Sequence, residues 1–173
     1  MLNNGLYSLW LMPSPPIRDT LRATIQELAR RLGTPEFEPH ITLLGNINGA
    51  AASSSERLRS LAAALGSISV SITNLQTTDH FDRSVILLAD GDQLHTANQL
   101  ARAAVGVADA DDYRPHLSLV YGSLSDDVRR FAATQAQGLL PLRFPCTELR
   151  LYRTMGPVDE WRMLERVELG DSS

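Results

Sequence analysis

Lysine is missing from this chain: all 16 of its basic residues are arginine, against 20 acidic residues, and the formal net charge is −4. Proteins that bind long nucleic acids contact many phosphates through Lys and Arg, so this balance argues against an extended RNA or DNA groove. It leaves room for a small phosphorylated ligand that is held by a few arginines and neutral donors. We therefore expect a small-molecule substrate and no extended nucleic acid as partner.

Cysteine and long apolar runs are scarce as well. The single cysteine, Cys146, cannot form a disulfide within the chain, and no apolar run reaches the length of a membrane span. The first five residues lack the basic segment of a secretory signal. We expect a cytoplasmic monomer without a membrane partner. Its 173 residues, 43% of them hydrophobic, suit one domain, residues 1–173, with a sizeable core.

The order of the predicted elements occurs twice along the chain. Each copy reads strand, helix, strand with a histidine, helix, strand. In the first copy the apolar and capping patterns place the elements at residues 6–12, 15–32 and 40–44, followed by a helix that ends at Gly66 and a strand at 68–72. In the second copy they lie at 85–88, 94–104, 116–120, 125–138 and around 149–151. A last strand is predicted at 161–169. Two copies, roughly residues 5–78 and 84–169, predict a bilobal α+β domain.

The two histidine strands carry the same motif. Residues 37–44 and 113–120 both read aromatic, charged, Pro, His, apolar, hydroxyl, Leu, apolar. Side chains of a strand alternate between its faces, so each histidine shares a face with the hydroxyl residue two positions later. Proline has no N–H for a ladder, which places each histidine at the beginning of its strand. The four side chains that we expect in one cleft are His40, Thr42, His116 and Ser118.

This pattern suits phosphoryl chemistry without a metal or another cofactor. One imidazole can act as general base and the other as general acid on opposite sides of one phosphorus atom, and the two hydroxyls can donate hydrogen bonds to its oxygens. A pair of structural histidines preserved by duplication is the alternative reading. A zinc site is disfavoured because His80 and His95 lie outside the motif without the close spacing of zinc ligands.

The motifs at 39–42 and 115–118 resemble the paired His-x-Thr/Ser motifs of the 2H phosphoesterase superfamily. The match is narrower than that: Tyr7–Trp10 before Pro13, the aromatic residue before each Pro-His pair, and Trp161 resemble the cyclic phosphodiesterase branch of plants and yeast. The similarity runs in order from about residue 6 to 169.

The resemblance implies the fold and the reaction. The expected fold is the α+β, LigT-like fold with pseudo-twofold symmetry, in which two mostly antiparallel sheets flank a central cleft and the helices lie outside. The expected reaction is the metal-independent hydrolysis of ADP-ribose 1″,2″-cyclic phosphate, and of nucleoside 2′,3′-cyclic phosphates to 2′-phosphates.

The resemblance also implies roles for seven residues. The acid/base pair would be His40 and His116, with His116 as the base; Thr42 and Ser118 would bind phosphate; Trp10, Tyr121 and Phe81 would line the substrate cavity. Strand alternation alone puts Tyr121 on the face opposite His116, unless a bulge or turn at Gly122 re-aims its ring. Ordinary core packing is the alternative for Trp10.

Two other functions stay open. One is the RNA 2′,3′-cyclic phosphodiesterase branch, formerly named 2′-5′ RNA ligases, which calls for a basic surface that this acidic chain does not show in its composition. The other is a nucleotide-binding module that kept the fold without turnover, against which the intact histidine and hydroxyl of both motifs argue.

Overall fold

The computed structural model describes residues 6–49, 54–108 and 112–170. Its elements are β1 (Leu6–Pro13), α1 (Pro15–Leu32), β2 (Ile41–Asn48), α3 (Ser55–Leu65), β3 (Ile68–Thr77), η1 (Phe81–Arg83), β4 (Val85–Asp90), α4 (Asp92–Val105), β5 (His116–Val120), α5 (Asp126–Ala136), η2 (Gln137–Leu139), β6 (Leu142–Arg153), η3 (Val158–Glu160) and β7 (Arg162–Glu168). The predicted helices and strands are present, and β3 and β6 are longer than predicted.

Helix α1 shows how the sequence sets the ends of an element. Ser14 is extended at the N-cap and prolines fill the first turn, where a helix N–H has no partner within the helix. Gly33 ends the helix with a left-handed φ of 66°, and its N–H donates to the carbonyl of Ala29. The buried apolar residues recur at helical spacing: Leu21, Ile25 and Leu28. This face packs against β5, so a helix from the first half supports the second histidine strand.

The seven strands form one sheet in the order β1-β2-β5-β4-β3-β6-β7, and a further pairing of β1 with β6 closes it. Every pairing is antiparallel. Strand β6 makes the closure, because residues 142–146 pair with β3 while residues 146–153 pair with β1. The register of β2 and β5 consists of the single pair Ile41–Leu117. The α+β class is confirmed, and the two expected sheets are continuous through β6 and this pair.

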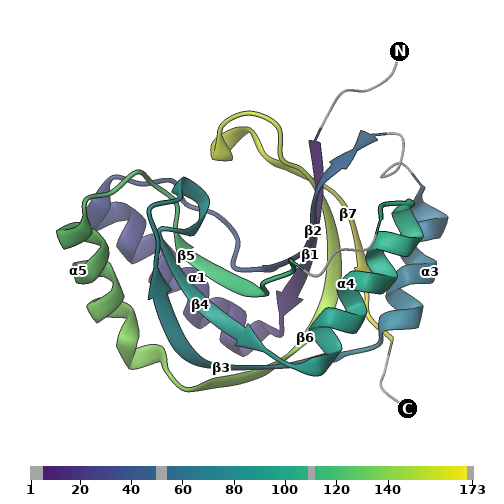
Figure 1. The fold of residues 1–173 in the computed structure, drawn as a ribbon, viewed down its shortest axis with the longest axis horizontal. Helices are drawn as coiled ribbons and strands as arrows, with labels where there is room; N and C mark the ends of the chain where they lie inside the picture. The colour runs from purple at the N-terminus through teal and green to yellow at the C-terminus, as the bar shows by residue number, and fades with distance from the viewer. Residues whose placement is uncertain (1–5, 50–53, 109–111, 171–173) are drawn as a thin grey trace.

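The helices lie outside the sheet in two pairs (Figure 1). Helix α1 packs on β5 and β1, and α5 packs on β3 and β4. On the other side α3 packs on β7, and α4 packs on β2 and β3. Strand β3, from residues 5–78, lies in the sheet between β4 and β6, which come from residues 84–169. Each half of the chain therefore contributes elements to both sides of the molecule. The division of the domain into two lobes at these residues stays a prediction.

Strand β1 is buried on both faces, and the two faces meet different surroundings. Leu9 and Leu11 belong to the main core between sheet and helices. Trp10 and Met12 point to the opposite face, where they pack with Tyr152 and with the half-buried Trp161. The aromatic residues thus gather on the inner, concave side of the closed sheet. Among the described residues, no helix is long and apolar enough to cross a membrane.

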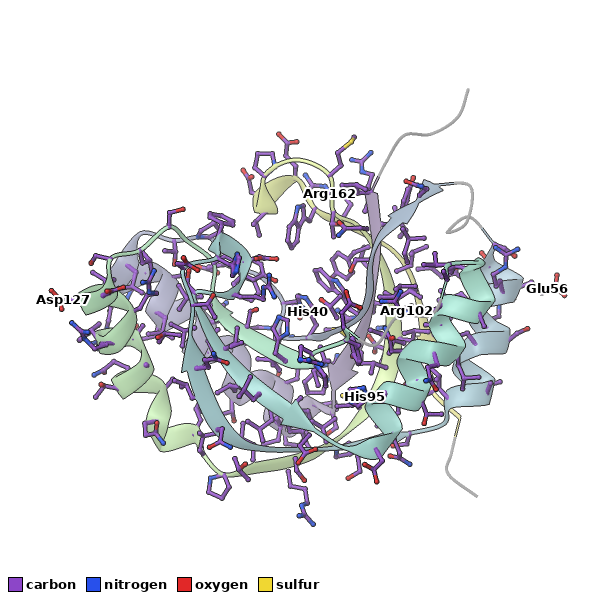
Figure 2. All side chains as sticks on the ribbon, viewed as in Figure 1. His40, Glu56, His95, Arg102, Asp127 and Arg162 are labelled. Atoms are coloured by element: carbon purple, nitrogen blue, oxygen red, sulfur yellow. The ribbon has the colours of Figure 1, made fainter. Side chains whose placement is uncertain are left out.

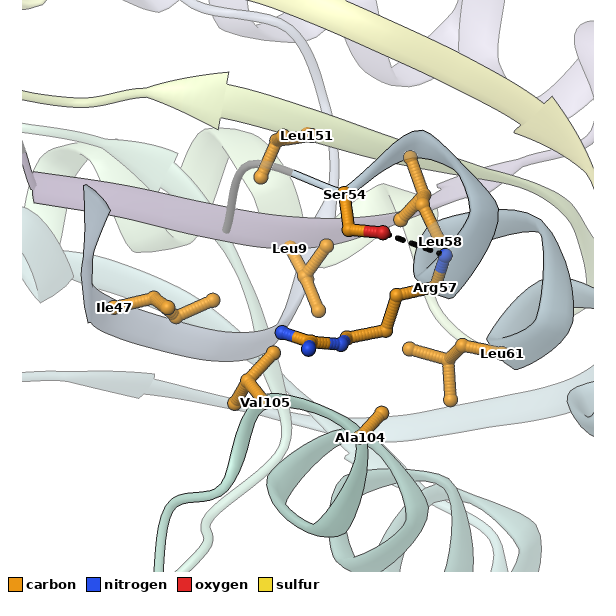
Figure 3. A pocket seen from close by; sticks show the side chains of 9 residues that line it. All are labelled: Leu9, Ile47, Ser54, Arg57, Leu58, Leu61, Ala104, Val105 and Leu151. Carbon is orange, nitrogen blue, oxygen red and sulfur yellow. Dashed lines mark hydrogen bonds between the residues drawn. The ribbon is translucent and has the colours of Figure 1, made fainter. Parts of the chain in front are cut away.

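A hollow beneath α3 and α4 is separate from that concave side (Figure 3). Its lining is apolar apart from Ser54 and Arg57, and its volume is about 20 Å³. That is room for about one water molecule, so the hollow is a packing gap. Ser54 has a structural role beside it, since its hydroxyl accepts the N–H of Arg57 and caps α3.

Candidate active site

Both histidines stand at the beginning of neighbouring strands, as their prolines predict. His40 directly precedes β2, and His116 is the first residue of β5. The pair Ile41–Leu117 joins the two strands in antiparallel fashion, so the residues that follow each histidine lie next to each other. Figure 2 shows His40 at the centre of the molecule, between the two pairs of helices.

One cavity of about 270 Å³ collects the motif residues from both strands. It is lined by Ser8, Trp10, His40, Thr42, Gly45, Asn46, Asp82, His116, Ser118, Tyr121, Thr154 and Trp161. The structure therefore brings together both histidines and both hydroxyls, together with two of the three predicted aromatic residues. A cavity of this volume can hold a group of the size of a sugar phosphate.

The two imidazoles are held in the same way. Nδ1 of His40 lies 2.6 Å from the carbonyl oxygen of Glu38, and Nδ1 of His116 lies 2.8 Å from that of Arg114. A carbonyl oxygen only accepts, so each Nδ1 carries the hydrogen and donates it. In the neutral ring Nε2 is then unprotonated and available to a substrate. The motif thus fixes both the tautomer and the orientation of each ring through a carbonyl two residues upstream.

Burial favours the neutral form of both imidazoles. It lowers the pKa of His40 to about 4; the hydrogen bond to the Glu38 carbonyl opposes this shift, and the charge of His116 adds to it. Burial also lowers the pKa of His116, against the bond to the Arg114 carbonyl, and the positive charge of Arg83 lowers it further. An anionic ligand between the rings would favour their protonated forms and raise both pKa values.

The hydroxyls differ in their surroundings. Ser118 is buried, and its Oγ donates to the carbonyl of Asp82 at 2.9 Å. Thr42 lines the cavity, and its backbone carbonyl accepts the hydroxyl of Tyr113 at 3.1 Å. To donate to a phosphate oxygen, the Ser118 hydroxyl must rotate away from the Asp82 carbonyl.

Trp10 forms the floor beneath one histidine. Its ring lies between His40, with centroids 3.5 Å apart and planes at 6°, and Tyr152, at 3.7 Å and 19°. Its Nε1 donates to Ser8 Oγ at 2.9 Å. Trp10 lines the cavity and is also packed against its neighbours, so its position agrees both with a wall of the cavity and with core packing. The stack restricts rotation of the His40 ring.

Tyr121 reaches the cavity because β5 ends one residue earlier, at Val120. Strand alternation therefore no longer dictates its direction, and its ring stacks on Phe37 with centroids 3.8 Å apart. The ring also meets Trp161 edge-on at 5.8 Å. Burial raises the pKa of the Tyr121 phenol, so it stays protonated and can act as a hydrogen-bond donor.

The prediction that Phe81 lines the cavity is corrected. Its side chain is 48% exposed and does not line the cavity, although its ring lies 6.3 Å from that of Tyr121. In the 3₁₀ turn at 81–83 successive side chains point about 120° apart, and Asp82 is the residue that lines the cavity. Asp82, Asn46 and Trp161 were not predicted as site residues; the left-handed φ of 55° at Asn46 has no signal in the sequence beyond the tolerance of asparagine for it.

A network of ion pairs lies behind His40. Glu38, whose carbonyl holds the His40 ring, receives both arms of Arg22 at 2.9 and 3.1 Å. Arg150 lies 3.9 Å from the same carboxylate and bonds the buried Glu148. The network fixes the backbone that positions the imidazole. Among the residues that the structure describes, no group of three or more His, Cys, Asp or Glu side chains is arranged to hold a metal ion.

Sequence comparison assigns most of the chain to one family. The sequence model of that family, described as cyclic phosphodiesterase-like protein, matches residues 6–169. A similar curated protein is the cyclic phosphodiesterase of Arabidopsis thaliana, which is 22% identical over 139 residues, covering 80% of this chain and 77% of the plant protein.

Solved structures share the fold at low identity. The protein TT0787 of Thermus thermophilus matches with a TM-score of 0.63 and 13% identity, covering 97% of this chain and all of that one. E. coli LigT complexed with phosphate matches with a TM-score of 0.59 and 14% identity over 99% of this chain and all of that one. These likenesses extend the agreement in fold to the whole described chain.

Proposed function

Because the chain belongs to the cyclic phosphodiesterase family and is an enzyme of that class, we propose that it hydrolyses small ribose cyclic phosphates by two-histidine acid/base catalysis without a metal ion. The substrates are ADP-ribose 1″,2″-cyclic phosphate and nucleoside 2′,3′-cyclic phosphates, the latter giving 2′-phosphates. The observation that carries the proposal is the matched pair of Nδ1–carbonyl bonds, which leaves Nε2 of both rings for the substrate in one cavity.

The reaction needs one base and one acid. The base takes a proton from water as the water oxygen forms a bond to phosphorus, and the acid gives its proton to the ribose oxygen as that P–O bond breaks. The hydroxyls of Thr42 and Ser118 donate to the non-bridging oxygens, which carry the negative charge. Neutral donors suffice because positioning and stabilised equatorial oxygens supply most of the catalysis in phosphoryl transfer.

We assign His116 as the base and His40 as the acid. His116 is the more exposed of the two rings, and the attacking water arrives from solvent. His40 is 5% exposed, so the negative charge of a bound cyclic phosphate has its largest effect there and raises the pKa that burial holds at about 4.

A substrate with sulfur in place of the leaving ribose oxygen tests this assignment. A thiolate leaves without protonation, so the sulfur compound should restore turnover to His40→Ala and leave His116→Ala inactive. The opposite pattern would reverse the two roles. Equal failure of both variants on the sulfur compound would count against a two-histidine mechanism.

A substrate panel tests the function itself. Purified protein is given ADP-ribose 1″,2″-cyclic phosphate, 2′,3′-cyclic mononucleotides and an RNA that ends in a cyclic phosphate, and products are resolved by chromatography. The first two should be hydrolysed, and His40→Ala and His116→Ala should each lower kcat by about 10²–10⁴-fold. His95→Ala, an exposed histidine outside the cavity, is the matched control. Preference for the RNA end would favour the RNA branch, and binding without turnover would favour a binding module.

A further inference from the structure

A second groove continues from the cavity past His116. Its volume is about 300 Å³. It shares four lining residues with the cavity, namely Thr42, Gly45, Asn46 and His116. Any ligand whose phosphate lies between the imidazoles therefore meets the opening of this groove. We name it the arginine groove after Arg83, Arg102 and Arg114, which line it.

The charge of the arginine groove contrasts with the rest of the chain. The protein carries a formal charge of −4 and no lysine, yet three arginines line this one groove, where Asp112 is the only acidic residue among the described residues of the lining. A concave surface of one sign concentrates the field and attracts ions of the opposite sign. An anionic ligand is the chemistry that fits.

Arg102 is already engaged by the protein. Its guanidinium donates to Asn98 Oδ1 at 3.0 Å and to the carbonyl of Ala108 at 3.0 Å, and it pairs with Asp112 at 3.5 Å. These contacts fix the end of α4, where Figure 2 shows Arg102. Arg102 therefore shapes the groove and neutralises Asp112, and three of its five N–H donors are already used by the protein.

Arg83 and Arg114 are the available cations. The Nε of Arg83 is buried without a hydrogen-bond partner among the described residues, and its ion pair with Asp82 is long, at 3.7 Å. Arg114 is exposed, and its guanidinium has one weak contact, 3.4 Å from the carbonyl of Tyr113. A buried donor without a partner costs free energy until a ligand satisfies it. Guanidinium groups pair particularly well with phosphate oxygens.

We propose that Arg83 and Arg114 bind the diphosphate of a substrate such as an ADP-ribose cyclic phosphate, while the cyclic phosphate lies between the histidines. The proposal rests on the proposed function, and it explains how one site would prefer an ADP-ribose cyclic phosphate to a cyclic mononucleotide. Two available arginines match the two charges of a diphosphate. A longer RNA would need a track of cations beyond the groove.

The test compares variants that lack one arginine charge on two substrates, one with a diphosphate and one without. Arg83→Gln and Arg114→Gln are assayed beside Arg166→Gln, an exposed arginine on β7 that lines neither the cavity nor the groove. Each groove variant should raise KM for ADP-ribose 1″,2″-cyclic phosphate about tenfold, the loss of roughly one charge-assisted hydrogen bond. The KM for a 2′,3′-cyclic mononucleotide should match that of Arg166→Gln. Because the charge of Arg83 also acts on the catalytic His116, any change in kcat should be the same on both substrates.

Other outcomes overturn the proposal. An equal rise of KM on both substrates would place the arginines at the reacting phosphate instead. A loss confined to a cyclic-phosphate-ended dinucleotide would assign the groove to the next phosphate of an RNA. Unchanged KM values would leave the groove without a role in binding.

A binding measurement separates this proposal from the proposed function. If the wild type hydrolyses none of the cyclic phosphates, the proposed function fails, but calorimetry with ADP-ribose, which has the diphosphate and no cyclic phosphate, still tests the groove. Affinity about tenfold weaker in Arg83→Gln and Arg114→Gln than in Arg166→Gln would support the groove as a diphosphate site. Equal affinity in all three would overturn it.

Discussion

The low pKa of His40 makes the stability of the whole protein depend on pH. In the folded chain burial lowers this pKa from 6.5 to about 4, whereas in the unfolded chain the imidazole is in water and keeps its ordinary value. Between these values the unfolded state binds a proton that the folded state rejects. The free energy of unfolding therefore falls as pH is lowered through this window, and the contribution of His40 is intact above about pH 6.5.

The size of the effect follows from the two pKa values. Going from about pH 7 to about pH 5, the His40 contribution to the free energy of unfolding falls by about 2 kcal/mol. Carboxylates also titrate in this range, so the comparison is a double difference: wild type against His40→Gln, which does not titrate, at both pH values. The free energy of unfolding falls by about 2 kcal/mol per molar of urea, so between the two pH values the urea midpoint should fall by about 1 M more in the wild type than in the variant.

Urea unfolding followed by circular dichroism measures this difference. His95→Gln is the control, because it removes an exposed histidine on α4 that lies outside the cavity. If His40→Gln loses as much stability as the wild type between the two pH values, the imidazole is not buried in its neutral form. That result would also remove the electrostatic basis for the acid role of His40.

Three further predictions concern the cavity. Trp10→Ala removes the ring between His40 and Tyr152 and should lower the free energy of unfolding by about 3 kcal/mol, measured by urea titration, with a loss of kcat in the fraction that folds. Ser118→Ala removes one phosphate donor and should lower kcat/KM about 100-fold in steady-state assays. It should lower the free energy of unfolding by only about 1 kcal/mol, for the lost bond to the Asp82 carbonyl. Dialysis against EDTA should leave turnover unaltered; a loss that a divalent ion restores would contradict the metal-independent mechanism.

The parts of the site that the sequence predicted depend on local rules. Period-two alternation placed His40 with Thr42 and His116 with Ser118, and all four line one cavity. Proline before each histidine marked the beginning of the strand. These features need only the chain within a few residues, and the duplication of the motif indicated that both copies meet.

The rest of the cavity depends on how distant segments close around it. Asp82 lies in a 3₁₀ turn and Trp161 in the connection between β6 and β7, so their approach to the histidines follows from the pairing of β6 with both β1 and β3. No local pattern encodes this closure. Phe81 failed as a prediction for the same reason, since a turn of three residues decides which side chain enters the cavity.

Placement of the catalytic pair also depends on the register between β2 and β5. A slip of one residue would turn the histidine and hydroxyl of one strand into the core and bring its apolar residues into the cavity. The ladder itself specifies this register weakly, because it holds only the pair Ile41–Leu117. Packing specifies it more strongly, since both residues of this pair are fully buried.

Side chains supply further hydrogen bonds that fix β2. The carbonyl of Thr42 accepts the hydroxyl of Tyr113, and the carbonyl of Leu43 accepts Nδ2 of the buried Asn98 at 2.7 Å. Both donors come from the second half of the chain, and Tyr113 is the aromatic residue of the second motif. Tyr113 therefore has a structural role in this protein, because its hydroxyl bonds the strand of the first motif to the segment that carries the second. The two motifs hold each other in register as well as sharing the cavity.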